Sequence, residues 1–335
     1  MSIEAKHIVY FGAADMPEVD TGQIGGAADK SRKITFEDII TTGVVSVVAE
    51  DIADTSIALT VYGRDASGAS VNEVISTHVS NGRTKVAGSQ AFERILKVSR
   101  ASASNTGALA VMSDSDLVTG TAVGGGTDYL TLESGDQQAD DYYKGWVVRM
   151  TGGTNVGQLR EVVKYVNSTN RIYVRDWDGG ACSTDTYELG VGVVLEHSGQ
   201  MGSAATTIDD VRRPFLGVAS DPDSAKIFYT KVFCYNVHAS QTLDAATIEE
   251  DASGAAELKS RISFGVEDAL NDTDVATNRV TAPDGYSFGN GPTDFANTKR
   301  FTYNSGQGVW MKLELAANDV AINDVYAFKV KGQTV

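Results

Sequence analysis

Proline and cysteine are both scarce in this chain, and a long apolar run is missing. Only 5 of the 335 residues are proline and 2 are cysteine, Cys182 and Cys234. Two cysteines so far apart exclude a disulfide framework and fit reduced thiols made in the cytoplasm. Because no stretch of about 18 apolar residues occurs, the sequence predicts no membrane-spanning helix. The first residues also lack the basic and then apolar pattern of a secretion signal.

Basic segments are missing as well. The formal net charge is −16, and acidic residues outnumber basic ones in each third of the chain. Binding to nucleic acid through phosphates needs a basic face, so we expect no nucleic-acid partner. An anionic membrane surface is disfavoured for the same reason. The charge is typical of an abundant protein that must stay soluble before it assembles.

Helical periodicity is absent too, whereas glycine is plentiful. No window of a dozen residues keeps an apolar stripe at helical spacing without an interruption by Gly, Asn or Asp. The 34 glycines recur at short intervals, as in chains built from short strands and tight turns. Hydrophobic residues make up 42% and charged residues 21%, which is a globular composition. The sequence therefore predicts an all-β, modular protein.

Changes in composition divide the chain into four segments. The first is rich in Gly, Ala and Asp and is expected to be an extended N-terminal arm. Glycine-rich and polar connections, Ser113–Gly126 and residues near Arg212-Arg213-Pro214, separate the remaining segments. The expected order is an arm (1–30), a β-sandwich (31–118), a small β-barrel-like module (119–197) and a second sandwich, jelly-roll-like (198–335).

The clearest pattern lies in the small module, between Ala139 and Asp178. Trp146–Met150 is an apolar run, and Gln158–Val166 is expected to form one continuous strand. Asn167–Asn170 is a hairpin turn, after which Ile172 and Val174 alternate with polar neighbours. The spacing predicts a compact set of strands that carries no chemistry of its own.

Catalytic and metal-binding patterns are largely missing. The four histidines, His7, His78, His197 and His238, do not have metal-ligand spacing and are interpreted as structural. The segment Gly152–Gln158 looks like a phosphate loop, but it lacks the Gly-Lys-Ser/Thr ending and precedes a strand, so we expect a turn. The sequence therefore predicts a protein that is not an enzyme and needs no cofactor or metal.

Two acidic regions keep alternatives open. Asp140, Asp141, Asp176 and Asp178 flank the aromatic residues Tyr142, Tyr143 and Trp177, as carboxylates do in glycan-cleaving or glycan-binding sites. Packing along strands satisfactorily explains the same aromatic residues and is the preferred interpretation. Glu267-Asp268 and Asn271–Asp274 group oxygen ligands that could suit calcium. Their spacing does not match an EF-hand, and a solvated acidic turn is the preferred interpretation.

Two segments resemble virion structural proteins of tailed bacteriophages. In the small module, Gly153-Thr154-Asn155-Val156-Gly157-Gln158 matches a recurrent Gly-Thr-x-x-Gly-Gln core. In the first sandwich, Thr60–Gly68 followed by Val86–Ile95 is similar to a strand–turn–strand of such proteins. The resemblance implies a non-enzymatic virion protein, and a capsid decoration or cement protein on the head surface is preferred. A tail, neck or fibre component is the alternative, and a carbohydrate-binding module or depolymerase is the alternative from another class.

On the decoration interpretation, the expected partners are the major capsid protein and further copies of this chain in a homo-oligomer such as a trimer. The arm is then expected to anchor the protein to the shell, and the tryptophans of the module are expected to make subunit contacts. The residues expected to make contacts are Ile3, Ile8, Tyr10, Phe11, Ile24, Trp146 and Trp177.

Overall fold

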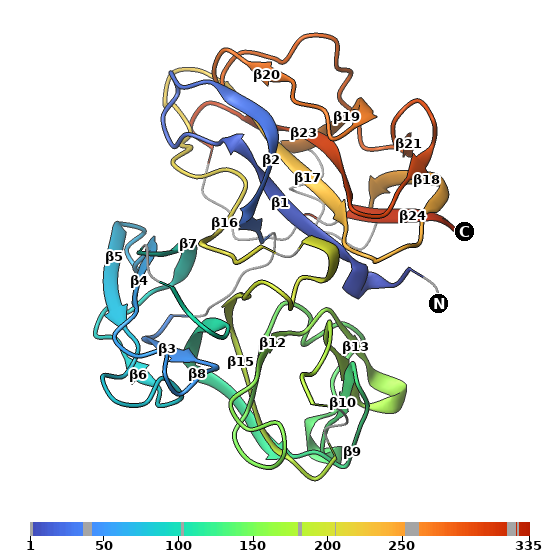
Figure 1. The fold of residues 1–335 in the computed structure, drawn as a ribbon. Coiled ribbons are helices and arrows are strands. Elements are labelled where there is room, and N and C mark those ends of the chain that lie inside the picture. Colours follow the sequence, from blue (N-terminus) through green and yellow to red (C-terminus); the bar gives the residue numbers. More distant parts are fainter. Residues whose placement is uncertain are drawn as a thin grey trace. The chain divides into compact units, whose positions relative to one another are not determined.

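The structure is a computed structural model that describes residues 3–35, 42–101, 104–179, 183–204, 206–251, 261–319, 326 and 328–335. Within those ranges the chain forms strands β1 to β24 and four 3-10 helices of three residues each (Figure 1). The predicted all-β class is confirmed. No helix in these ranges is long and apolar enough to cross a membrane. The short helices are η1 (Ala5–His7), η2 (Ser134–Asp136), η3 (Asn167–Thr169) and η4 (Gly202–Ala204).

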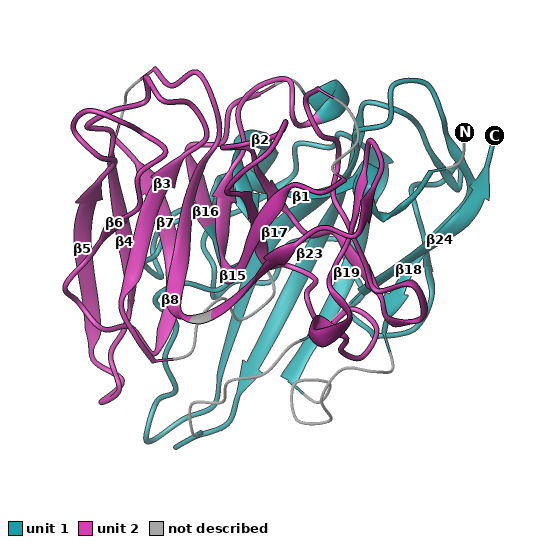
Figure 2. Ribbon diagram, turned by 90° about the horizontal axis from the view of Figure 1, so that it is seen from below, with its two compact units in different colours: residues 1–38, 202–204, 212–335 teal, residues 39–201, 205–211 magenta. Residues whose placement is uncertain are grey.

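The chain divides into two compact units, coloured separately in Figure 2. Unit 1 comprises residues 1–38, 202–204 and 212–335, and unit 2 comprises residues 39–201 and 205–211. This division differs from the expected one, because the arm and the last domain belong to the same unit. The expected boundary at 118/119 also falls inside one strand, β8 (Leu109–Thr121), which pairs with β15 (Thr186–Leu195) on both sides of it.

The main sheet of unit 1 contains both early and late strands. Its strands follow the order β19 (Ile262–Leu270), β23 (Ser305–Leu315), β17 (Lys226–Asn236), β1 (Ile8–Asp15) and β2 (Ile24–Ile34). All neighbours are antiparallel, and β17 pairs with β23 without a register shift from Lys226↔Leu315 to Asn236↔Ser305. The short strand β20 (Val275–Ala276) pairs with the start of β2. Figure 1 shows the blue β1 beside the yellow β17.

The expectation of an extended N-terminal arm is wrong for the described residues. Strand β1 lies between β17 and β2 and hydrogen-bonds to both. Its alternating residues Val9, Phe11 and Ala13 are all buried in the core. The pattern of a half-buried strand therefore outweighs the high content of Gly, Ala and Asp that suggested a flexible segment.

A second, smaller sheet of unit 1 is centred on β18 (Leu243–Glu250). Strand β24 (Phe328–Thr334) pairs along it, from Leu243↔Thr334 to Glu250↔Phe328. The short strands β21 (Thr293–Asp294) and β22 (Arg300–Phe301) also pair with β18. The rings of Phe295 and Phe301 meet edge to face at 4.9 Å between their centroids and are fully buried.

Unit 2 contains three groups of strands. The first places β4 (Ala58–Arg64) between β5 (Ser70–Ser76) and β7 (Arg94–Arg100). The second is a six-stranded sheet with the order β12 (Leu159–Glu161), β11 (Val147–Met150), β15, β8, β3 (Val45–Ala49) and β6 (Val86–Ala87). The third has the order β13 (Lys164–Val166), β14 (Arg171–Tyr173), β10 (Tyr129–Thr131) and β9 (Gly124–Gly125). The remaining strand of the chain is β16 (Asp210–Arg212).

The small module is not the barrel-like body that the sequence suggested. None of the sheets formed by the described residues is closed into a barrel. The segment Gln158–Val166 also differs from the single strand predicted for it, because it forms β12 in one sheet and β13 in another. The chain thereby joins two sheets over one core of aromatic and aliphatic side chains, among them Tyr143, Tyr165 and Trp177.

Candidate functional site

The loop Gly152–Gln158, which joins β11 to β12, is organised around a buried carboxylate. Asp185 accepts hydrogen bonds from the backbone N–H groups of Thr154 (3.0 Å) and Asn155 (3.1 Å) and from the Asn155 side chain (3.2 Å). Converging backbone N–H groups make an anion-binding site. In this loop the anion is Asp185 itself, which is only 3% exposed. The prediction of a turn followed by a strand is confirmed.

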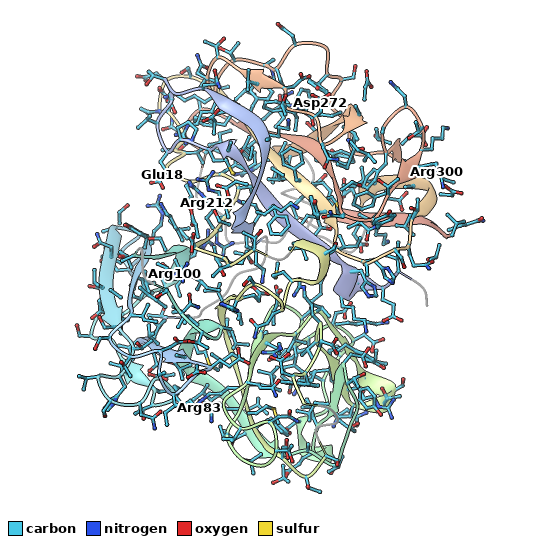
Figure 3. All side chains as sticks on the ribbon, in the orientation of Figure 1. Glu18, Arg83, Arg100, Arg212, Asp272 and Arg300 are labelled. Atoms are coloured by element: carbon cyan, nitrogen blue, oxygen red, sulfur yellow. The ribbon has the colours of Figure 1, made fainter. Side chains whose placement is uncertain are left out.

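Two glycines of the loop are required by its geometry. Gly153 has φ +87°, and a Cβ there would collide with the Asp185 carboxylate. Gly157 has φ +95°, and its Cβ would collide with the guanidinium of Arg83, which is labelled in Figure 3. Residues with a side chain rarely adopt such φ values, and here they would also lack space. The loop can therefore form in this shape only with glycine at both positions.

Gln158, the last residue of the loop, completes a buried polar network. Its amide donates to Asn155 Oδ1 (2.7 Å), and its Oε1 accepts from the backbone N–H of Asp178 (2.9 Å). Arg160, only 2% exposed, pairs with Glu50 Oε1 (2.7 Å) and with Asp178 Oδ2 (2.9 Å). These bonds connect the end of the loop and the start of β12 to the segments that carry Asp178 and Glu50. We call the loop, Asp185, Asp178, Arg160 and Glu50 the loop lock.

The aromatic residues near the loop lock are mostly interior. Tyr143 (1% exposed) and Trp177 (4%) belong to the core of unit 2. Trp146 is half-buried against Tyr142, with 5.7 Å between ring centroids, and Tyr142 is 51% exposed. Of the three aromatic residues considered for a glycan site, only Tyr142 presents much of its ring to solvent.

The residues expected to make contacts divide into two groups by exposure. Phe11, Ile24 and Trp177 are buried in the chain's own core, so they are not accessible to another subunit. The other four are half-buried: Ile3, Ile8, Tyr10 and Trp146. The structure thus leaves no fully exposed residue among the seven.

His7, His238 and Cys234, which lie in the described part of the chain, take part in contacts of the fold itself. His7 and His238, far apart in the sequence, meet with 4.5 Å between their ring centroids. Each uses Nδ1 to accept backbone N–H groups, from Glu4 to His7 and from Ser240 and Gln241 to His238. Cys234 is buried, which raises the pKa of its thiol, and Cys182 lies outside the described residues.

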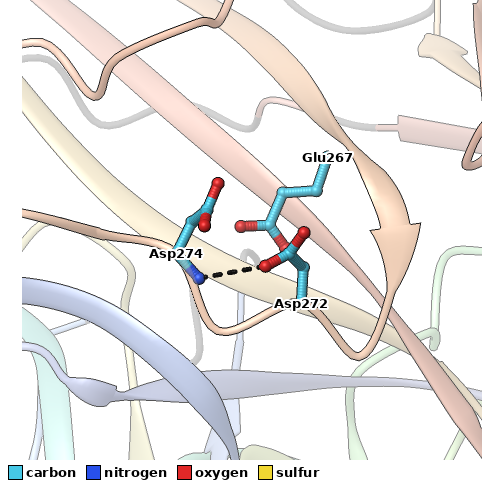
Figure 4. A group of neighbouring side chains, drawn as sticks. All are labelled: Glu267, Asp272 and Asp274. Atoms are coloured by element: carbon cyan, nitrogen blue, oxygen red, sulfur yellow. Dashed lines mark hydrogen bonds between the residues drawn. The ribbon is translucent and has the colours of Figure 1, made fainter.

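A second cluster lies in unit 1, in the acidic loop after β19. Carboxylate oxygens of Glu267, Asp272 and Asp274 lie within 4.8 Å of one another (Figure 4). The backbone N–H of Asp274 donates to Asp272 Oδ1 (3.2 Å), and Tyr286 donates its hydroxyl to Asp274 Oδ2 (2.6 Å). Hard oxygen ligands of this kind suit a divalent cation. Asp274 is exposed and Asp272 half-buried, as in a solvated turn, but the Glu267 side chain is fully buried.

The basic group of this cluster is the amine of Lys231 on β17. Its Nζ lies 2.5 Å from Glu267 Oε1 and donates to the backbone carbonyl oxygens of Asp272 (3.0 Å) and Asp274 (3.2 Å). Burial raises the pKa of Glu267 to about 7 against the opposing effect of Lys231, and burial also lowers the pKa of Lys231. The sequence analysis missed Lys231. Its signal was a lone charged residue on the same strand face as Tyr229 and Phe233.

No family model matches the chain, and neither a curated protein nor a solved structure matches it significantly. Its function must therefore be argued from the geometry above together with the two sequence segments that resemble virion proteins. Both the loop lock and the Lys231 cluster are built around buried charged or polar groups, Asp185 and Arg160 in the first and Lys231 and Glu267 in the second. Arrangements of this kind hold segments in place.

Proposed function

We propose that this chain is a structural protein of a bacteriophage virion, and specifically a decoration protein on the outer surface of the head. The observation that carries the proposal is the loop lock. The residues that resemble the recurrent virion motif, Gly153, Thr154, Gly157 and Gln158, are the ones that shape and hold this loop. These residues fix the conformation of the loop, which is a structural role and suits a protein of an assembled particle.

The charge and the fold class support the same proposal. A net charge of −16 keeps an abundant protein soluble until it meets its binding surface. Antiparallel sheets with buried ion pairs, such as Arg160 with Glu50, form rigid bodies suited to repeated contacts. A decoration protein would bind the major capsid protein and copies of itself on the assembled shell. Because it binds only that state, it would stabilise the shell by mass action.

The location within the particle can be tested by quantitative mass spectrometry of purified heads and separated tails. Decoration predicts many copies of this chain per head and essentially none on tails. Enrichment on tails would favour the alternative, a tail, neck or fibre component. Absence from both fractions would overturn the virion proposal altogether.

One observation favours a second candidate, a carbohydrate-binding surface. Tyr142 is 51% exposed beside Trp146, and such rings can stack on sugars. However, the adjacent carboxylates of Asp140 and Asp141 accept backbone N–H groups from Asn167 and Tyr165. A glycan array and a reducing-sugar assay on host polysaccharide, with Tyr142→Ala as the control, would separate the two functions. Binding that depends on Tyr142 would support this candidate.

A further inference from the structure

Lys231 and Glu267 reach each other across an intervening strand of the main sheet of unit 1. Lys231 lies on β17 and Glu267 on β19, and β23 pairs with both strands. Glu267 lies where the register of β19 shifts against β23. The two side chains meet above Gly308 of β23, where a Cβ would collide with the Glu267 carboxylate. The absence of a side chain at Gly308 therefore creates the space in which the amine and the carboxyl group touch.

Hydrogen bonding aims the lysine nitrogen at the carboxyl group. Two backbone carbonyl oxygens, those of Asp272 and Asp274, accept hydrogen bonds from Lys231 Nζ. A neutral amine has two N–H bonds and one lone pair. When both N–H bonds point to these carbonyl oxygens, the lone pair points toward Glu267. Its Oε1 lies 2.5 Å from Nζ.

The surroundings favour the neutral forms of both groups. Both side chains are fully buried, and Nζ lies over the rings of Phe233 (4.8 Å to the centroid) and Trp310 (5.6 Å). In this setting burial lowers the pKa of Lys231 and raises that of Glu267 to about 7. Burial disfavours charge, and this shifts the balance toward the neutral amine and the carboxylic acid.

We propose that Lys231 and Glu267 form an intramolecular isopeptide bond. The lone pair of Nζ attacks Cδ of the Glu267 carboxylic acid, whose proton is on Oε2, and a C–N bond forms. Trp310 Nε1, which donates to Glu267 Oε1 at 3.2 Å, stabilises the negative charge that develops on that oxygen.

The remaining steps release water and need no other reactant. After the attack the nitrogen is positively charged and must lose one proton, and the hydroxyl oxygen Oε2 must gain one before it can leave. We assign this transfer to the carboxylate of Asp272 or Asp274, whose oxygens lie within 4.8 Å of the Glu267 carboxyl group. Oε2, which has no hydrogen-bond partner among the described residues, leaves as water when the C–O bond breaks. Oε1 remains as the amide carbonyl oxygen. No atom is oxidised or reduced, and the bond is independent of the proposed virion role.

The test is the mass of the purified full-length chain, measured under denaturing conditions. The wild-type protein is expected to be lighter than its sequence mass by one water molecule. The variant Lys231→Arg, whose guanidinium cannot form this amide, is expected at its full sequence mass. Proteolysis and fragmentation should then give one branched peptide that carries both Lys231 and Glu267. If the variant does not fold, the wild-type mass and peptide map still decide.

A control is needed because another reaction also removes one water. Asp178-Gly179 and Asp284-Gly285 are sequences at which a succinimide can form. Mild alkali hydrolyses a succinimide and restores the full mass, whereas it leaves an isopeptide bond intact. The proposal is overturned if the wild-type chain has its full sequence mass, if alkali restores that mass, or if the branch maps to other residues.

Discussion

The strongest test of the loop lock is the substitution Asp185→Ala. Asp185 is 3% exposed and accepts hydrogen bonds from two backbone N–H groups and one side-chain amide. Its removal leaves the backbone N–H and the side-chain amide of Asn155 buried without this acceptor, and the N–H of Thr154, which lies nearer the surface, also loses it. Each buried donor without an acceptor costs about 1–3 kcal/mol, so the two on Asn155 give an expected loss of about 2–6 kcal/mol in the free energy of unfolding. That is a large share of the roughly 5–15 kcal/mol that stabilises a typical domain.

Urea unfolding followed by tryptophan fluorescence measures this loss, since Trp146 and Trp177 both lie in unit 2. The matched control is Asp140→Ala, which removes an exposed carboxylate that accepts one backbone hydrogen bond, from Asn167 at 2.7 Å. We expect the control to cost about 0.5–1 kcal/mol. If both variants lose the same small amount, the buried carboxylate does not organise the loop and the reasoning is wrong.

The same variant offers a second measurement. With the Asp185 carboxylate removed, the two N–H groups still point at an anion-sized space. Added formate should therefore stabilise the Asp185→Ala protein by mass action and leave the wild-type protein unchanged. Equal effects of formate on both proteins would contradict the view that Asp185 acts as a built-in anion.

Three further predictions concern other residues. Gly308→Ala should destabilise unit 1 by about 1–3 kcal/mol in chemical denaturation, because the new methyl group overlaps the Glu267 carboxylate. Trp177→Ala should cost about 3–5 kcal/mol, as the loss of a buried aromatic side chain does. Burial lowers the pKa of His238 below its ordinary value near 6.5, so its contribution to stability is present above that pH and is lost as pH falls through the folded pKa. An NMR titration of His238 and unfolding curves would test that prediction. Both should cover about pH 4 to 8, the range in which a histidine ring titrates.

Each of these predictions has a matched control. Gly291→Ala places a methyl group in open space and should change stability little. Tyr142→Ala removes a half-exposed ring, and a loss as large as that of Trp177→Ala would argue against the packing argument. In His238→Gln, the pH dependence assigned to this ring should disappear. Its persistence would assign that dependence to another group, such as the adjacent His7.

The strand content could be predicted from the sequence because alternation and turn residues are local signals. The run Val309–Leu315, with apolar residues at odd positions, lies within β23, and the turn at Gly152–Gln158 is present as expected. Local signals fail where the role of a residue depends on segments that are far away in the sequence. Gly25 was interpreted as part of a flexible arm, yet its φ of +102° and the closeness of the Asp274 carbonyl oxygen explain why glycine occupies that position.

The features that could not be predicted depend on pairing between segments that are far apart in the sequence. The sequence does not show that Ile8 pairs with Asn236, so the common unit of the first and last strands could not be predicted. For the same reason the acidic residues Glu267, Asp272 and Asp274 were visible as a group, whereas their partner Lys231 was not. Its place inside an apolar strand was the only hint of a buried pair.

The central position of β1 has a consequence for synthesis. Its hydrogen bonds go to β17, which in turn pairs with β23 as far as Leu315. On the ribosome, β1 must therefore wait for partners that emerge much later. Unit 2 consists almost entirely of residues 39–201 and can fold during that interval. Loss of β1 or of β23 should therefore unfold unit 1 in both cases. Deletion of residues 1–30 would remove β1, which is a core strand.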